Sequence, residues 1–161
     1  MPVVRPGVIR EEIVVDGHLE SVFDFMTDFS NSHLWDPGVV RSVSEGKFER
    51  LMIGVGSSFD LTVKFNSSEM DMKYYIIEYK HPYQVVLYGE GKIIKAIDTI
   101  KFKRLDNNKV EIQYEADLTL KGWRRPFIFF INNSLNKLGN AAKCGIQSYF
   151  KFGNKNKYKQ D

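Results

Sequence analysis

Residues 122–152 keep a helical periodicity over a longer stretch than any other part of the chain, which restricts the folds available to it. The apolar residues recur three and four positions apart: Phe127, Phe130, Ile131, Leu135, Leu138, Ala142, Ile146, Tyr149 and Phe150. Pro126 suits a first helical turn, and Gly153 suits a helix end. The spacing predicts a helix roughly 40 Å long. Its one apolar face requires an extended sheet to cover it.

Small residues interrupt the middle of this apolar side, where a filled core would favour Leu or Phe. They are Ser134, Ala141 and Gly145, with Ala142 and Leu138 beside them. Two explanations remain open from the sequence. Either another backbone approaches the helix closely there, or space is left for a ligand.

The remainder of the chain alternates apolar and polar residues with period two, as expected for strands with one wet and one buried face. The predicted strands are 8–16, 39–45, 58–65, 70–79, 84–89, 94–104 and 110–120. Two short helices are expected after the first strand, at 19–31 and 33–38. These elements predict an α+β fold in which a curved antiparallel sheet of six or seven strands holds the long C-terminal helix on its concave side.

The length of 161 residues predicts one domain, 1–153, followed by a basic tail at 154–161. Cys144 is the only cysteine, so no internal disulfide can form, and a reducing compartment fits. The first ten residues contain no apolar signal core, and no apolar run reaches the ~18 residues that a membrane span requires. We therefore expect a cytoplasmic protein. The sequence does not predict an oligomeric state.

The formal net charge of +3 is carried entirely by the segment after Phe150. It contains Lys151, Lys155, Lys157, Lys159 and Asp161. The neutral body argues against a nucleic-acid-binding surface, which needs a basic stripe over the fold itself. The tail is either simply solvated or attracts the chain transiently to an anionic membrane, at about 1 kcal/mol per lysine near the surface.

Common catalytic and cofactor motifs are absent. Gly54-x-Gly56 precedes a strand and lacks the Gly-Lys-Ser/Thr of a phosphate loop. The three histidines are far apart in sequence, and Cys144 has no partner at zinc spacing. No Gly-x-Ser-x-Gly nucleophile elbow occurs. We expect no metal and no cofactor.

Several strings resemble one family along nearly the whole chain: VFDFMTD at 22–28, LWDPGV at 34–39, GVGSSF at 54–59, the strand around Asp98, and ADLTLKG at 116–122. They are similar to the START/Bet v 1-like (SRPBCC) superfamily, in its polyketide cyclase/dehydrase and lipid-transport branch. The resemblance implies a helix-grip fold with a cavity for an apolar molecule between helix and sheet. The superfamily includes lipid carriers, ubiquinone-binding proteins, hormone receptors and cyclases, so the resemblance does not specify the ligand.

Strand parity and the helix wall together predict which residues contact such a ligand. The candidate ligand-binding residues are Trp35, Phe59, Leu61, Val63, Tyr74, Ile76, Leu87, Asp98, Ile100, Tyr114, Ala116, Phe130, Ser134, Leu138, Ala141, Ala142 and Gly145. Trp35 lies in a short segment that is either a lid over the open end or a plug over the core. Trp123 is followed by Arg124 and Arg125, which form either an exposed basic turn or a site for an anionic group.

The parity of its strand puts Asp98 on an inward, apolar face, between Ala96 and Ile100. A buried carboxylate is costly without a partner. Its functional interpretation is a polar anchor for a ligand, or an acid/base with a raised pKa. The structural alternatives are a bulge at 95–97 that turns Asp98 outward, or a hydrogen bond to the C-terminal helix.

Two functions of different classes follow from these features. The first is a non-enzymatic carrier or sensor of a hydrophobic molecule (lipid, isoprenoid or polyketide-like), favoured by the absence of a recognisable catalytic set. The second is a cyclase or dehydratase in which Asp98 works with Tyr74, Tyr114 or His33 in proton transfer. A third, an adapter with a collapsed cavity, would follow if aromatic side chains filled the space.

Overall fold

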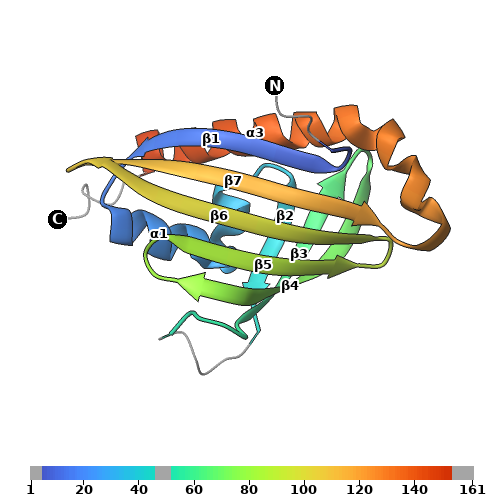
Figure 1. The fold of residues 1–161 in the computed structure, drawn as a ribbon, viewed down its shortest axis with the longest axis horizontal. Helices are drawn as coiled ribbons and strands as arrows, with labels where there is room; N and C mark the ends of the chain where they lie inside the picture. Colours follow the sequence, from blue (N-terminus) through green and yellow to red (C-terminus); the bar gives the residue numbers. More distant parts are fainter. Residues whose placement is uncertain (1–4, 46–51, 154–161) are drawn as a thin grey trace.

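A curved antiparallel sheet wraps around one long helix in the computed structural model, which describes residues 5–45 and 52–153 (Figure 1). In these residues the sheet has seven strands in the order β1-β7-β6-β5-β4-β3-β2. The strands are β1 (Val8–Asp16), β2 (Val39–Ser44), β3 (Ser58–Phe65), β4 (Ser68–Lys80), β5 (Gln84–Gly91), β6 (Ile94–Asp106) and β7 (Lys109–Leu120). The helices are α1 (Leu19–Thr27), η1 (Phe29–Asn31), α2 (Ser32–Trp35), η2 (Gly122–Ile131) and α3 (Asn132–Phe152). The predicted α+β helix-grip fold is confirmed. The predicted tail at 154–161 lies outside the described residues.

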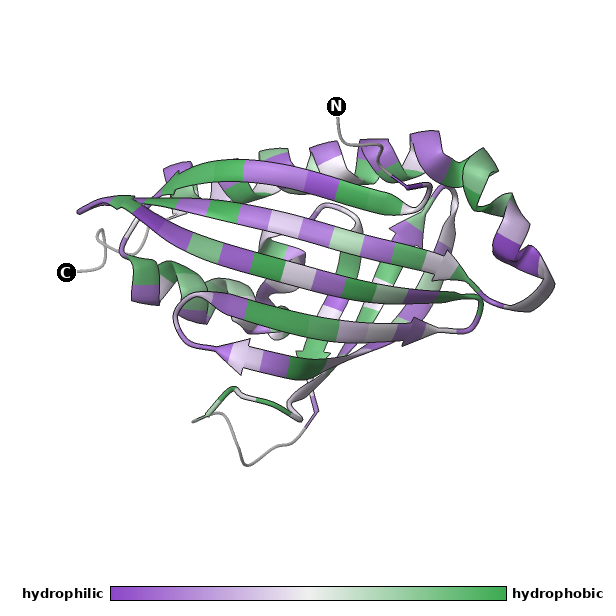
Figure 2. Cartoon of the chain, in the orientation of Figure 1, coloured by the Kyte–Doolittle hydropathy of each residue, from purple (hydrophilic) through white to green (hydrophobic). Residues whose placement is uncertain are grey.

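Each predicted strand is present, and its alternation is visible along the ribbon (Figure 2). Inward residues of β6 are buried at Ile94, Ala96, Asp98, Ile100 and Phe102. This regular pattern creates a concave apolar face and a polar outer face.

The C-terminal segment is helical from Gly122 to Phe152, but its first ten residues form the 3₁₀ helix η2 and only the remainder is α-helical. Gly122 starts the segment with φ of 59°. Pro126 has no N–H to donate to the carbonyl of Gly122, the bond that an α-helix would need there. The apolar face predicted for the whole segment is therefore fully buried only in α3, at Leu135, Ile146 and Phe150. In η2, Ile128 and Ile131 pack partly against the core.

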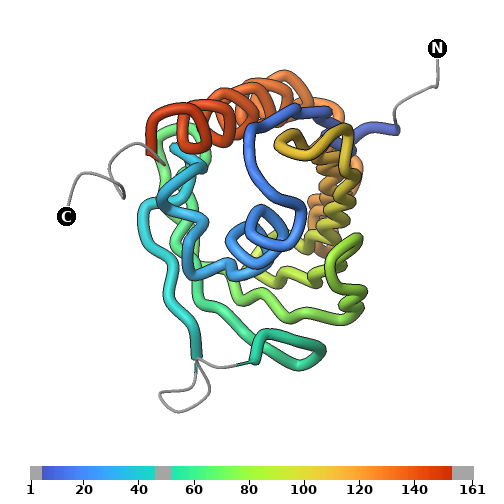
Figure 3. Tube along the Cα trace, turned by 90° about the vertical axis from the view of Figure 1, so that its left-hand side faces the viewer, coloured from blue at the N-terminus to red at the C-terminus, as the bar shows by residue number. Residues whose placement is uncertain are grey.

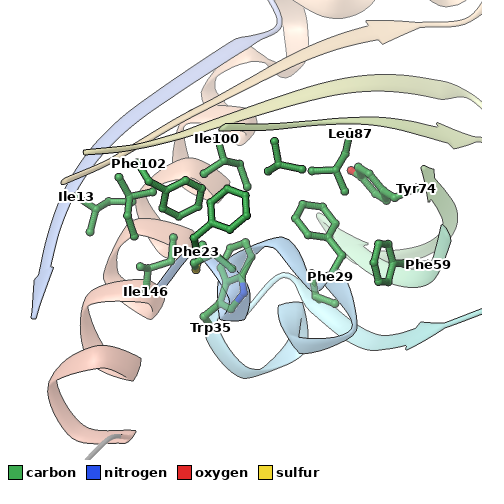
Figure 4. Close-up of a cluster of buried hydrophobic side chains, with 14 of the residues drawn as sticks. Ile13, Phe23, Phe29, Trp35, Phe59, Tyr74, Leu87, Ile100, Phe102 and Ile146 are labelled. Carbon is green, nitrogen blue, oxygen red and sulfur yellow. The ribbon is translucent and has the colours of Figure 1, made fainter. Parts of the chain in front are cut away.

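Two short elements close one end of the curved sheet. Figure 3 shows α1 inside the ring formed by the sheet and α3. Phe23 of α1 packs edge-on against Tyr79 and Phe102, with ring centroids 5.3 and 5.0 Å away. Phe29 and Trp35 continue the aromatic cluster toward the middle of the molecule (Figure 4). This end is a filled core.

The small residue Gly145 marks a close approach of two backbones. A Cβ at this position would overlap the carbonyl oxygen of Trp35 and lie 3.1 Å from Cδ of Pro37. Of the two explanations for the small residues, close backbone packing is therefore correct at Gly145. α3 also packs along β1, where a Cβ on Gly139 would lie 2.5 Å from Cγ2 of Ile9.

Gly145→Ala is expected to lower the free energy of unfolding by about 1–3 kcal/mol, because a rigid backbone carbonyl must move to accept the methyl group. Helix propensity alone would change it by up to about 1 kcal/mol in the opposite direction. Urea denaturation measures the difference, and Asn140→Ala at an exposed α3 position is the propensity control. Equal gains in both variants would contradict the close packing.

Within the part of the chain that is described, no helix is long and apolar enough to cross a membrane.

Candidate ligand-binding cavity

A cavity of about 150 Å³ lies between α3 and the concave face of the sheet and is partly open. Strand parity and one stripe of α3 supply its walls. The lining residues are Ile9, Glu11, Ile13, Phe29, Ser32, Trp35, Asp36, Gly38, Val39, Leu61, Val63, Lys64, Phe65, Met70, Met72, Tyr74, Ile94, Asp98, Tyr114, Ala116, Leu118, Leu135, Leu138, Gly139, Ala142, Lys143 and Ile146. An apolar cavity of about 150 Å³ accommodates a molecule the size of benzene. A longer ligand has to extend through the opening or move side chains.

The aromatic cluster forms the inner end of this cavity. Phe29 lies 5.3 Å from Tyr74 and 6.4 Å from Trp35, centroid to centroid. Trp35 in turn meets Tyr114 at 6.1 Å. Figure 4 shows Phe29 and Trp35 between α2 and the sheet. Trp35 is 3% exposed, so of the two roles considered for it, the plug over the core matches its position.

Asp98 points into the cavity and is 4% exposed. The β6–β7 register is uninterrupted around it, and Asp98 pairs with Ala116. Its Oδ2 accepts a hydrogen bond of 2.5 Å from the hydroxyl of Tyr114. Both structural alternatives, the bulge and the bond to the C-terminal helix, are therefore wrong: the partner is a tyrosine on the neighbouring strand.

Burial raises the pKa of Asp98 to about 7, against the hydrogen bond from Tyr114, which lowers it. The nearby carboxyl of Asp36 raises it further. Burial also raises the pKa of Asp36, although a hydrogen bond of 2.8 Å from the N–H of Gly38 to its Oδ1 lowers it. The pKa values of Tyr74 and Tyr114 lie well above the ordinary value, first because of burial and then because of Asp98. Both phenols therefore remain protonated at neutral pH.

Three buried polar atoms of cavity-lining residues have no hydrogen-bond partner among the described residues: Oδ1 of Asp98, Nε1 of Trp35 and Oγ of Ser32. Buried polar atoms are nearly always paired with protein or water. An acceptor and a donor that lack partners in an apolar cavity can bind the polar groups of a ligand.

Nine of the predicted ligand-binding residues line the cavity: Trp35, Leu61, Val63, Tyr74, Asp98, Tyr114, Ala116, Leu138 and Ala142. Four others point inward as predicted but belong to the filled core: Phe59, Ile76, Leu87 and Ile100. Figure 4 includes three of these core residues, Phe59, Leu87 and Ile100.

The other four predicted residues, Phe130, Ser134, Ala141 and Gly145, do not line the cavity. Phe130 lies in η2 and is 81% exposed, because the 3₁₀ segment does not continue the apolar face of α3. Ser134 and Ala141 lie beside the lining stripe of α3 rather than on it, and Gly145 is covered by the backbone of Trp35. His33 is also outside: its Nδ1 lies 2.8 Å from Oγ of Ser42 on the exposed side of α2.

Four charged residues that line the cavity were not among the predicted ligand-binding residues: Glu11, Asp36, Lys64 and Lys143. Glu11 of β1 and Lys143 of α3 both line the cavity, with 4.0 Å between Oε2 and Nζ. The parity of β1 carried a signal for Glu11, since Ile9 and Ile13 flank it on the inward face. Lys143 had no such signal, because a lysine among polar helix residues usually faces solvent.

The fold matches solved structures closely, although sequence comparison finds nothing. Neither the protein-family models nor the curated proteins contain a match to the sequence. A START superfamily protein from Mycobacterium smegmatis matches with a TM-score of 0.73 and 12% identity, covering 89% of this chain and 97% of that one. The Zhui aromatase/cyclase from Streptomyces sp. R1128 matches with a TM-score of 0.65 and 10% identity, over 91% and 96%.

A third structure, the di-domain aromatase/cyclase BexL from the BE-7585A biosynthetic pathway, matches with a TM-score of 0.71 and 10% identity. The match covers 94% of this chain and 48% of BexL, so this chain spans about half of that protein. The chain therefore has the fold of this START superfamily protein and of these aromatase/cyclases, as the resemblance implied. At these identities the matches define the fold alone.

Proposed function

We propose that the protein binds a hydrophobic small molecule carrying at least one hydrogen-bonding group, and carries or senses it. The observation behind this proposal is the apolar cavity in which Asp98 Oδ1 and Trp35 Nε1 have no partner among residues 5–45 and 52–153. The similarity to START superfamily and aromatase/cyclase structures supports a ligand-binding role. A lipid, an isoprenoid or a polyketide-like compound would place part of its apolar skeleton in the cavity of about 150 Å³ and extend through the opening.

The two polar atoms define the complementary groups of the ligand. The indole N–H of Trp35 can only donate, so it selects an acceptor such as a carbonyl. With a pKa of about 7, Asp98 is partly protonated at neutral pH and can donate to a carbonyl or accept from a hydroxyl. An anionic ligand is disfavoured near Asp98 and Asp36. We therefore infer that the part of the ligand beside Asp98 and Trp35 is uncharged and carries a carbonyl or hydroxyl group.

Trp35 supplies a direct test, because the only other tryptophan, Trp123, is 71% exposed and can be removed. In Trp123→Phe, titration with decanol is expected to shift the emission of Trp35 at lower concentrations than titration with decane. The two probes have the same chain length and differ in the hydroxyl. Native mass spectrometry of protein purified from its own cells should detect a retained apolar compound.

Two results together would exclude this function: no retained compound, and Trp35 emission that neither probe changes. Equal response to decanol and decane would keep the cavity but remove the polar selection assigned to Asp98 and Trp35.

A second candidate is an enzyme of the cyclase or dehydratase type, favoured by the short bond between Asp98 and Tyr114 together with the pKa of about 7. A group titrating near neutral pH is suited to general acid/base catalysis. In this function Asp98 would exchange a proton with the bound compound while the phenol of Tyr114 orients the carboxyl.

The retained compound distinguishes the two functions. If the protein is a dehydratase, it would release the compound with the mass of one water removed. Asp98→Asn would then keep the compound bound without this loss of mass. A carrier would return it unchanged from both proteins.

A further inference from the structure

The outer face of η2 exposes aromatic side chains that the rest of the described chain leaves uncovered. The exposed fractions are 71% for Trp123, 46% for Phe127, 68% for Phe129 and 81% for Phe130. None of the residues in η2 is buried by the other described residues. In Figure 1 the segment projects beyond the sheet, at the opposite end of α3 from α1, and Figure 2 shows its apolar colouring. So much exposed aromatic surface on one short segment indicates a partner.

Three of these side chains, Trp123, Phe127 and Phe130, form one connected cluster. Trp123 meets Phe127 edge-on with 5.9 Å between ring centroids, and Phe127 meets Phe130 at 6.0 Å. Ile128 points the other way, toward Gly7. A Cβ built on Gly7 would lie 3.0 Å from Cγ1 of Ile128. Ile128 and Ile131 thus fix η2 to the body of the protein, while the aromatic cluster faces outward.

Positive charge accompanies the aromatic cluster. The guanidinium of Arg124 lies 4.5 Å from the centroid of the Trp123 ring. Within the described parts of the chain, no ion pair joins Arg124 or Arg125 to a carboxylate. The segment 122–131 contains no acidic residue. Its two cations are therefore free to attract an anionic surface.

We propose that η2 docks the protein on an anionic lipid surface, with Trp123, Phe127, Phe129 and Phe130 entering the headgroup region and Arg124 and Arg125 contacting lipid phosphates. Aromatic residues combined with arginine are the composition of interfacial membrane-binding segments. Protein interfaces are also enriched in aromatic residues and arginine, so the choice of a lipid surface rests on the lack of any side-chain acceptor or carboxylate in η2. The side chains of η2 offer no acceptor and, beyond the indole and the guanidiniums, no donor.

This docking would bring one end of the cavity to the membrane. Leu118 and Leu135 line the cavity and lie close in sequence to the two ends of η2. The membrane contact considered for the lysine tail is thereby assigned mainly to η2. The assignment does not depend on which ligand, if any, occupies the cavity.

Co-sedimentation of the full chain with vesicles tests the proposal, using phosphatidylcholine alone and an equal mixture of phosphatidylcholine and phosphatidylserine. We expect binding to the mixed vesicles. Phe129→Ser/Phe130→Ser should weaken it at least about tenfold, since two exposed rings no longer enter the lipid. Arg124→Gln/Arg125→Gln should remove about a tenfold preference for the anionic lipid. Tyr83→Ser, at a 61% exposed aromatic in the β4–β5 turn, is the matched control and should bind normally.

Two further arms keep the result unambiguous. In Trp35→Phe, where Trp123 is the only tryptophan, adding mixed vesicles should shift its emission to shorter wavelength. Deleting 154–161 should leave most of the binding. Binding that requires the tail but survives Phe129→Ser/Phe130→Ser would overturn the proposal. Absence of vesicle binding would also overturn the proposal. If the protein binds no vesicles and Phe129→Ser/Phe130→Ser converts a dimer to a monomer in size-exclusion chromatography, the aromatic cluster contacts a second copy of the chain instead.

Discussion

Ala142→Phe is expected to abolish binding of small apolar molecules while lowering the free energy of unfolding by no more than about 1 kcal/mol. Ala142 lines the cavity on α3, in the same stripe as Leu138 and Ile146. A phenyl ring there would extend into the empty volume of about 150 Å³ rather than into packed atoms. Overpacking of a filled core would cost about 1–3 kcal/mol or more. Decanol titration in the Trp123→Phe background and urea denaturation measure the two effects.

Ala141→Phe is the matched control, because Ala141 is the preceding residue of the same helix and does not line the cavity. It should retain decanol binding. A strongly destabilised Ala142→Phe, from a parent that binds neither decanol nor decane, would show that the sheet packs directly on α3 and that a carrier function is wrong.

The second large effect is a loss of stability with rising pH that originates at Asp98. Its pKa is about 7 in the folded protein and near 3.8 in the unfolded chain, so the folded state binds the proton more tightly. The stabilisation from protonated Asp98 is therefore complete below pH ~4 and is lost as the pH rises to about 7. Above that pH, the contribution of Asp98 to the free energy of unfolding no longer changes. This difference in pKa between the folded and unfolded states corresponds to a total on the order of 4 kcal/mol. The raised pKa of Asp36 acts in the same direction.

Asp98→Asn removes this ionisation and should be more stable than the unsubstituted protein at pH 8, with the difference disappearing toward pH 4. Urea denaturation of ligand-free protein between these pH values measures it. Asp16→Asn, which makes the same substitution at an exposed position at the end of β1, is the control. A pH-independent difference for Asp98→Asn would mean that Asp98 is not buried as a neutral acid.

The sheet could be predicted from the sequence because each strand carries its own period-two signal. In β6 the inward set that includes Ala96, Asp98 and Ile100 is buried as expected. Parity alone was thus enough to place Asp98 on the inward face. It could not identify Tyr114 as its partner, since that contact depends on the register between β6 and β7.

It was harder to predict which residues of α3 line the cavity. The apolar stripe shows which side of the helix is buried, but tertiary contacts set the rotation of the helix about its own axis. Leu138 and Ala142 lie in the cavity as predicted, whereas Ser134 and Ala141 lie beside it. The aromatic residues of η2 extended the stripe in sequence but not in space, so Phe130 was wrongly placed. Separating the cavity from the filled core, as at Phe59 and Leu87, requires knowledge of how α1 and η1 pack, which no local pattern contains.

The pairing of β1 with β7 also determines when during synthesis this cavity can exist. Ile13 is made early but pairs with Ile112, and the cavity wall supplied by α3 follows later still. On the ribosome β1 therefore waits without its partner until almost all of the sheet has been made, a high-contact-order arrangement that folds slowly and leaves apolar strands exposed to aggregation. Any molecule held between α3 and the sheet can therefore enter the completed cavity only after α3 has been translated.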